Sequence, residues 1–289
     1  MNTSQMRISV VTPSYNQAKY LEECLRSVKE QSYLPYEHIV VDGASTDGSV
    51  ELLRQLKSSP GYQHLRWISE PDRGQSDALN KGFRSARGDL IGWLNSDDKY
   101  RPGCFDNVVS DFGRHEECDV LYGDYTLIDQ DNRCLQIRRE ISFSPFVLAY
   151  HKVLYIPTTA TFFSRKIFQE GNFVDVQYQY AMDYEFFLRL SRRGYRFRHI
   201  PRLLADFRWH AQSKTGSAAW RQTEEQDLIL ARYSPRLSSA HGGFSKGSTL
   251  SLLRNLAALR RYSEKLLRGY YFTQFQGGRI TGKWDFETK

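Results

Sequence analysis

Residues 90–98 read LIGWLNSDD, an apolar run that ends in two adjacent aspartates. The run over 90–94 is typical of a buried strand, and two neighbouring carboxylates directly behind it repel one another. A hard divalent cation such as Mg²⁺ or Mn²⁺ removes this conflict, because it binds carboxylate oxygens and keeps positions open for phosphate. Asp97 and Asp98 are therefore candidate metal ligands, and the alternative is an exposed acidic turn before Arg101.

Outside this stretch, apolar runs alternate with amphipathic segments. Helical spacing places Leu21, Cys24, Leu25 and Val28 on one face of a first helix. Alternating strands and helices are typical of a parallel sheet that is covered on both faces. We therefore expect an α/β fold with a mostly parallel central sheet, flanked by helices and followed by a helical C-terminal extension. The first four strands are expected over 7–12, 38–41, 65–69 and 90–94.

Beyond residue 102 the alternation loosens, and the elements are expected to be more varied. Two helices and a hairpin are predicted, the helices over 104–112 and 181–192 and the turn of the hairpin over 129–132. Strands are predicted over 120–122, 134–137, 158–164, 197–200 and 203–209.

Unusual polar residues follow each of the first four strands. In a parallel sheet the carboxyl ends of the strands meet at one edge, where ligands bind. The chain has neither a glycine-rich dinucleotide fingerprint nor a P-loop, so we expect a metal ion to help bind phosphate. The four polar groups are 13–16 (PSYN), 42–45 (DGAS), 72–74 (DRG) and 97–98 (DD).

The composition of the 289 residues permits an ordinary core, with 40% hydrophobic and 25% charged residues. A net charge of +7 favours polyanionic partners: phosphorylated ligands, an anionic membrane face or nucleic acid. The four cysteines show no CxxC spacing, and neither a leader peptide nor an apolar run of membrane-spanning length is visible. We therefore expect a cytoplasmic protein with reduced thiols.

Three ordered segments carry a family resemblance: residues 10–32 (VVTPSYNQAKYLEECLRSVKEQS), 39–53 (IVVDGASTDGSVELL) and 69–98. The last of these segments ends with residues 90–98, the stretch quoted above. Together they resemble a family 2 glycosyltransferase of GT-A fold, of the soluble type involved in bacterial polysaccharides. The resemblance implies a GT-A domain over 1–215, with a nucleotide-sugar half (1–100) and an acceptor half (101–215). Residues 216–289 then form a basic helical extension.

The resemblance also implies roles in donor binding. An aromatic side chain packs on the base or ribose, a carboxylate accepts a hydrogen bond from the base, and a glycine permits close approach to the diphosphate. The alternatives are ordinary turn, core and surface residues. The residues in question are Pro13, Tyr15, Asn16, Asp42, Asp72, Arg73, Gly74, Asp77 and Asn80.

For the Mn²⁺ or Mg²⁺ ion, the resemblance favours Asp98 as the main ligand. It gives Asp97 a contact with a sugar hydroxyl or a second contact with the metal. Many relatives are acidic where this chain has Asn95, so the chain departs from a strict DxD pattern. His210 resembles a late histidine that completes the metal shell, and Lys214 is placed to offset phosphate charge.

The catalytic base is expected at Asp183, where the family carries an acidic pair, with Glu185 as the second choice. An aspartate that merely caps the helix N-terminus is the alternative. Thr158, Thr159 and Thr161 are candidates for the acceptor side.

These residues predict a metal-dependent inverting glycosyltransferase that uses a nucleotide-diphosphate sugar, with a UDP-sugar favoured. We expect a glycan or lipid-linked acceptor, in surface or extracellular polysaccharide assembly. The alternative is a non-catalytic module that binds sugar nucleotides or nucleic acid. Lysines and arginines are spread along the chain rather than gathered in one stripe, so we expect no nucleic-acid partner.

Residues 245–271 place Leu252, Leu256, Leu259, Leu266 and Tyr270 on one helical face, and the segment is strongly basic. Such a helix can lie on an anionic membrane, here the inner face. The alternative is packing on the domain or across a homodimer.

Overall fold

The computed structural model describes residues 6–151, 153–210, 219–233 and 245–271. Within them a single sheet has the order β3-β2-β1-β4-β8-β6-β9-β5, and β7 pairs with β6. The first four strands are parallel and alternate with helices, as predicted. They are β1 (Ile8–Ser14), β2 (Glu37–Asp42), β3 (Leu65–Ser69) and β4 (Leu90–Trp93), separated by α1 (Ala18–Lys29), α2 (Ser49–Lys57) and α3 (Gln75–Ser85).

From β8 onward the sheet is mixed, because β8 runs antiparallel between β4 and β6. The two strands predicted over 197–200 and 203–209 form one strand. This strand, β9, pairs with β6, and the register of the pairing shifts between Ile200 and Leu203, where Pro201 has no N–H to donate to the ladder. The later strands are β5 (Lys99–Tyr100), β6 (Val120–Ile128), β7 (Cys134–Arg138), β8 (Thr161–Ser164) and β9 (Phe197–Arg208). The predicted strand over 158–164 begins instead as a 3₁₀ turn, η1 (Thr158–Ala160).

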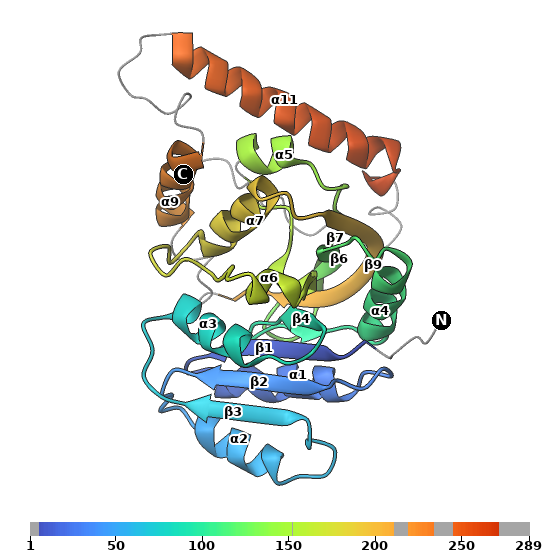
Figure 1. The fold of residues 1–289 in the computed structure, drawn as a ribbon, viewed down its shortest axis with the longest axis vertical. Helices are drawn as coiled ribbons and strands as arrows, with labels where there is room; N and C mark the ends of the chain where they lie inside the picture. Colours follow the sequence, from blue (N-terminus) through green and yellow to red (C-terminus); the bar gives the residue numbers. More distant parts are fainter. Residues whose placement is uncertain (1–5, 152, 211–218, 234–244, 272–289) are drawn as a thin grey trace.

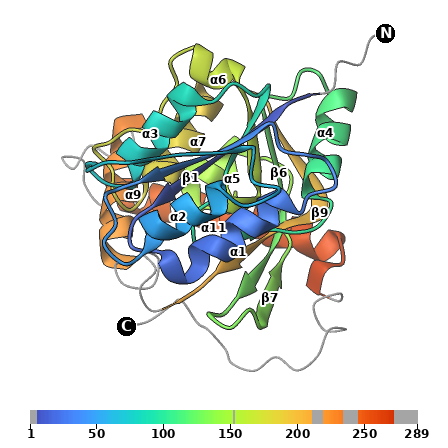
Figure 2. The same cartoon turned by 90° about the horizontal axis from the view of Figure 1, so that it is seen from below.

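Helices cover both faces of the sheet (Figures 1 and 2). One face packs on α3, α6 (Lys166–Gln169) and α7 (Met182–Arg192) through an aromatic core in which Phe83 stacks on Phe168 at 4.3 Å. The other face packs on α1 and α4 (Cys104–Arg114). Strands β1 and β2 are buried along their whole length, as expected for parallel strands between two helical layers.

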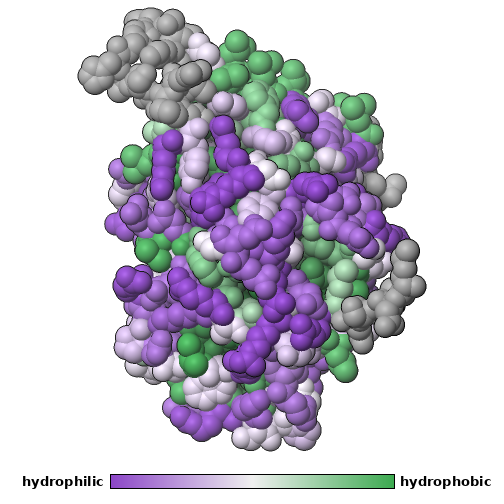
Figure 3. Space-filling view, in the orientation of Figure 1, coloured by the Kyte–Doolittle hydropathy of each residue, from purple (hydrophilic) through white to green (hydrophobic). Residues whose placement is uncertain are grey.

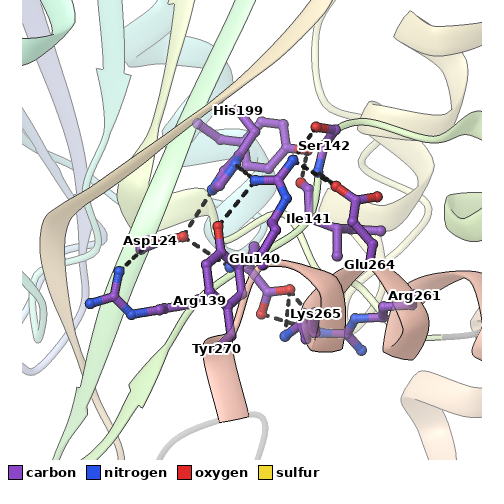
Figure 4. Close-up of polar contacts among 12 residues, drawn as sticks. Asp124, Arg139, Glu140, Ile141, Ser142, His199, Arg261, Glu264, Lys265 and Tyr270 are labelled. Atoms are coloured by element: carbon purple, nitrogen blue, oxygen red, sulfur yellow. Dashed lines mark hydrogen bonds and ion pairs between the residues drawn. The ribbon is translucent and has the colours of Figure 1, made fainter. Parts of the chain in front are cut away.

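Helices α9 (Ala219–Tyr233) and α11 (Ser245–Leu267) complete the outer layer; α9 lies beside α7, and α11 crosses the molecule over α5 (Pro145–Tyr150) (Figure 1). Two cations of α11 point inward. Buried Glu140 pairs with Arg261 at 3.0 Å and with Lys265 at 3.1 Å (Figure 4). No described helix combines the length and apolar character that crossing a bilayer requires.

The leucine face predicted for α11 is exposed. Leu252, Leu256, Leu259 and Leu266 are exposed, and hydrophobic side chains lie along the edge of the molecule formed by α11 (Figure 3). Tyr270 is buried and does not share their face, so that part of the prediction was wrong. Two cations of the helix, Arg261 and Lys265, thus meet a buried carboxylate, whereas its leucines and Arg260 are exposed.

Candidate active site

A cavity of about 650 Å³ opens where the carboxyl ends of the parallel strands meet. One wall comes from the ends of β1 and β4 and from the segments after β1, β2, β3 and β4. The opposite wall comes from η1, the start of α7, the end of β9 and Gln222 of α9. Some of the strand-end residues that were predicted to share a site thus line one cavity, and others do not. The predicted site residues that line the cavity are Pro13, Tyr15, Asp72, Gly74, Asp97, Asp183 and His210, together with Thr158.

Gly43 lets two of these walls approach each other. A Cβ at Gly43 would lie 2.8 Å from Asp72 Oδ2 and 3.2 Å from the Tyr15 ring. Asp72 is fixed by accepting a hydrogen bond from Gly74 N at 2.8 Å, and Tyr15 is 63% exposed. An open aromatic ring beside a fixed carboxylate can stack on a base or ribose and accept a hydrogen bond from it.

Asp42 and Asn16 do not line the cavity. The buried Asp42 carboxylate accepts hydrogen bonds from Ser45 N at 2.9 Å and from Ser69 Oγ at 2.7 Å. Asn16 Oδ1 accepts one from Thr46 N at 2.9 Å. Both side chains therefore hold the loops together, and the predicted direct contact of Asp42 with a base does not fit this arrangement.

Arg73, Asp77 and Asn80 are also absent from the cavity lining. Arg73 is largely exposed and pairs with Asp77 at 3.0 Å, and this hydrogen bond lowers the pKa of Asp77. The buried Asn80 amide donates to Val174 O at 2.8 Å and accepts from Val174 N at 2.9 Å. These predicted ligand contacts are replaced by contacts within the protein. Lys214 lies outside the described residues.

Asp97 and His210 form the pair best suited to hold a cation. Asp97 Oδ2 lies 3.0 Å from His210 Nε2, both residues line the cavity, and the Tyr20 ring packs on the imidazole at 5.1 Å. The described residues contain no cluster of three or more His, Cys, Asp or Glu side chains arranged for a metal. One carboxylate and one imidazole fit Mg²⁺ or Mn²⁺ when phosphate oxygens and water complete the shell.

Asp98 faces the interior and does not line the cavity. Its carboxylate accepts hydrogen bonds from Thr159 Oγ1, from Arg208 N at 2.8 Å and from Asn95 Nδ2 at 3.1 Å. Burial, and then the charge of Asp97, raise the pKa of Asp98 well above its ordinary value. The expectation that Asp98 is the main metal ligand therefore does not fit this geometry, because its oxygens are already committed. Of these two neighbouring aspartates, Asp97 is the one that lines the cavity.

Arg208 is a site residue that the sequence did not reveal. Its buried guanidinium donates to Asp97 O at 2.8 Å, pairs with Glu23 at 2.7 Å, and lies 4.8 Å from the Tyr20 ring centroid. It therefore fixes the backbone of Asp97 beneath the cavity. An Arg-Trp dipeptide at the end of an apolar strand was the available signal.

On the opposite wall, Asp183 stands in the first turn of α7, and its Oδ1 accepts a hydrogen bond from Tyr184 N at 2.8 Å. Glu185 does not line the cavity. It is buried against Arg189, at 2.8 Å, and accepts from Tyr233 Oη at 2.6 Å. Two residues along a helix turn a side chain by about 200°, so Asp183 and Glu185 face different ways. Glu185 as an alternative base does not fit this arrangement.

The polar cavity lies at the strand ends of a mixed α/β sheet, and sequence comparison assigns the chain to a family. The model of "Glycosyl transferase family 2" matches residues 9–171, and that of "Glycosyl transferase family group 2" matches residues 92–253. The chain belongs to glycosyltransferase family 2, and it is a glycosyltransferase.

Similar proteins include an uncharacterized glycosyltransferase of Rickettsia prowazekii, 27% identical over 91% of this chain and 87% of its own. The putative teichuronic acid biosynthesis glycosyltransferase TuaG of Bacillus subtilis is 28% identical, over 72% of this chain and 85% of its own.

Two solved structures share the GT-A fold. TarS of S. aureus, in complex with UDP-GlcNAc, has a TM-score of 0.61 at 18% identity and covers 81% of this chain and 73% of its own. The mannosyltransferase PcManGT of Pyrobaculum calidifontis, in complex with GDP-Man and Mn²⁺, has a TM-score of 0.58 at 20% identity and covers 94% of this chain and 85% of its own.

Proposed function

We propose that the protein is a metal-dependent inverting glycosyltransferase that takes its sugar from a nucleotide-diphosphate donor, with a UDP-sugar favoured. The observation that carries this proposal is that Asp97, His210 and Asp183 line a single cavity, with Asp97 Oδ2 3.0 Å from His210 Nε2. TarS binds UDP-GlcNAc and PcManGT binds GDP-Man with Mn²⁺, which supports a nucleotide sugar and a divalent ion here.

Asp97 and His210 would hold the Mn²⁺ or Mg²⁺ ion, and the ion would neutralise charge on the departing diphosphate. Tyr15 and Asp72 would contact the nucleoside. Asp183 would accept the proton of the acceptor hydroxyl as that oxygen bonds to the anomeric carbon. The bond from the anomeric carbon to the diphosphate oxygen breaks, and its electron pair leaves with the nucleoside diphosphate. A single displacement of this kind inverts the anomeric configuration.

The acceptor is proposed to be a glycan or a lipid-linked glycan in surface polysaccharide assembly, as the name of TuaG suggests for that relative. The exposed leucines of α11 support a position at the surface of a membrane, where a lipid-linked acceptor resides.

The test measures nucleotide binding and sugar release separately, with UDP-, GDP- and dTDP-sugars in Mn²⁺ or in EDTA. Asp183→Asn is expected to bind the nucleotide normally and to lose about 10²- to 10⁴-fold in transfer rate, the usual contribution of a general base. The anomeric configuration of the product, read by NMR, tests inversion. Full activity of Asp183→Asn in a folded protein would contradict the assignment of the base.

A further inference from the structure

The segment that carries Asp183 is held by a residue of α9, a helix that lies more than forty positions further along the chain. Residues 179–181 precede α7, and Ala181, the N-cap of α7, has no side chain that caps the helix. Their backbone N–H groups point to one carboxylate, that of Glu225 on α9. The N–H of Gln179 lies 2.9 Å from Oε1, and those of Tyr180 and Ala181 lie 2.8 and 2.7 Å from Oε2.

A carboxylate suits this position physically. The first N–H groups of a helix have no partner within the helix, and its N-terminus carries partial positive charge. Hydrogen bonds from N–H groups to an ionised carboxylate are about twice as strong as neutral ones. Glu225 thus binds the N–H group of the N-cap residue Ala181 and those of the two loop residues before it, Gln179 and Tyr180.

Helix α9 is itself held in place independently of Glu225. Tyr233 Oη donates to Glu185 Oε1 at 2.6 Å, Arg232 pairs with Asp175 at 3.2 Å, and Ile229 is buried. Arg221 also donates to Tyr180 Oη at 2.8 Å. These contacts hold α9, and with it the Glu225 carboxylate, in place.

The fastened segment is a wall of the cavity. Gln179, Tyr180, Met182 and Asp183 all line it, and Gln222 of α9 lines it as well. A Cβ at Gly74 would lie 2.9 Å from Gln179 Oε1, so this segment also meets the donor side. A change in the position of residues 179–181 would accordingly move Asp183 relative to the donor.

We propose that Glu225 is a positioning residue, which holds the first turn of α7 so that Asp183 reaches the acceptor hydroxyl, and that α9 is part of the active site. This inference rests on the proposed function for its effect on catalysis, but the fastening can be measured without any reaction.

The experiment compares Glu225→Gln, Glu225→Asp and the matched control Glu224→Gln, which removes the same charge from an exposed neighbour. Hydrogen exchange of residues 179–181 is followed in the free protein. We expect faster exchange in Glu225→Gln, because its amide offers one acceptor oxygen and adds donors, partial recovery in Glu225→Asp, and no change in the control. Thermal melting confirms that each variant is folded at the temperature used.

The second readout is release of UDP from a UDP-sugar with water as the acceptor, alongside binding of UDP with Mn²⁺. Glu225→Gln is expected to bind UDP normally and to lose about 10- to 100-fold in rate, as small misplacements of a catalytic group do. Unchanged exchange would overturn the fastening, and faster exchange with an unchanged rate would overturn the positioning role. If the wild-type protein neither binds UDP nor releases it, the proposed preference for a UDP-sugar fails, and the exchange result still decides the fastening.

Discussion

Replacing Asp97 or Asp98 by asparagine should separate metal binding from folding. Asp98 is buried and accepts three hydrogen bonds, and asparagine retains one acceptor oxygen. The Thr159 hydroxyl can turn to accept from the new amide, but a donor is left without a partner, at a cost of about 1–3 kcal/mol. Asp98→Asn is therefore expected to lower the free energy of unfolding by about that amount.

Asp97 instead has a partly exposed side chain at the cavity, so Asp97→Asn should leave stability nearly unchanged. Loss of a charged metal-ligating side chain should weaken the binding of UDP with Mn²⁺ by about 2 kcal/mol, which raises the Kd about 30-fold. With UDP and Mn²⁺ at about 100 times the wild-type Kd, the ligand stabilises the wild-type protein by about 2.7 kcal/mol. In Asp97→Asn the same concentration should add only about 0.9 kcal/mol.

Chemical denaturation with and without UDP and Mn²⁺ measures both quantities in each variant. EDTA should reduce the wild-type response to that of Asp97→Asn. The reasoning is refuted if Asp98→Asn keeps its stability but loses the nucleotide response, while Asp97→Asn retains it.

Two further predictions concern stability and surface contact. Burial lowers the pKa of His38 to about 3, whereas an unfolded histidine titrates near 6.5. The unfolded chain thus binds more protons between these pH values. As the pH falls from 7 to 5, the titration of His38 should therefore lower the free energy of unfolding by about 2 kcal/mol. His38→Gln should remove this loss, and an unchanged pH dependence of denaturation in that variant would contradict the prediction. Because Leu256 and Leu259 of α11 are exposed beside Arg260, vesicle flotation should be stronger with anionic than with neutral lipid and should be lost on replacing both leucines by serine. Flotation that survives the two leucine substitutions would show that other groups make the contact.

The first hundred residues could be interpreted well from sequence because each strand is short, apolar and followed by a polar group. Parallel pairing brings these groups together without any knowledge of side-chain direction. The choice between Asp97 and Asp98 could not be made in this way. A turn in which Asp98 N donates to Asn95 O decides which carboxylate faces the cavity, and neighbouring residues in a turn point in different directions.

Contacts between residues that are far apart in the sequence could not be predicted either. Glu225 reaches residues 179–181 across more than forty positions, and nothing in its local sequence distinguishes it from Glu224. The inward direction of Arg261 and Lys265 on α11 follows from Glu140, a carboxylate in a different part of the chain. Periodicity identified the leucine face of α11 but could not tell which face the protein would cover.

The pairing of Glu140 with α11 also bears on the order in which the protein matures during synthesis. Glu140 is made 121 residues before Arg261, its partner in the finished fold. Chains generally fold from the N-terminus as they are made, so the sheet can assemble while this carboxylate has no cation beside it. The nascent domain must therefore keep Glu140 hydrated or protonated, and its outer layer closes only after the last helix has been made.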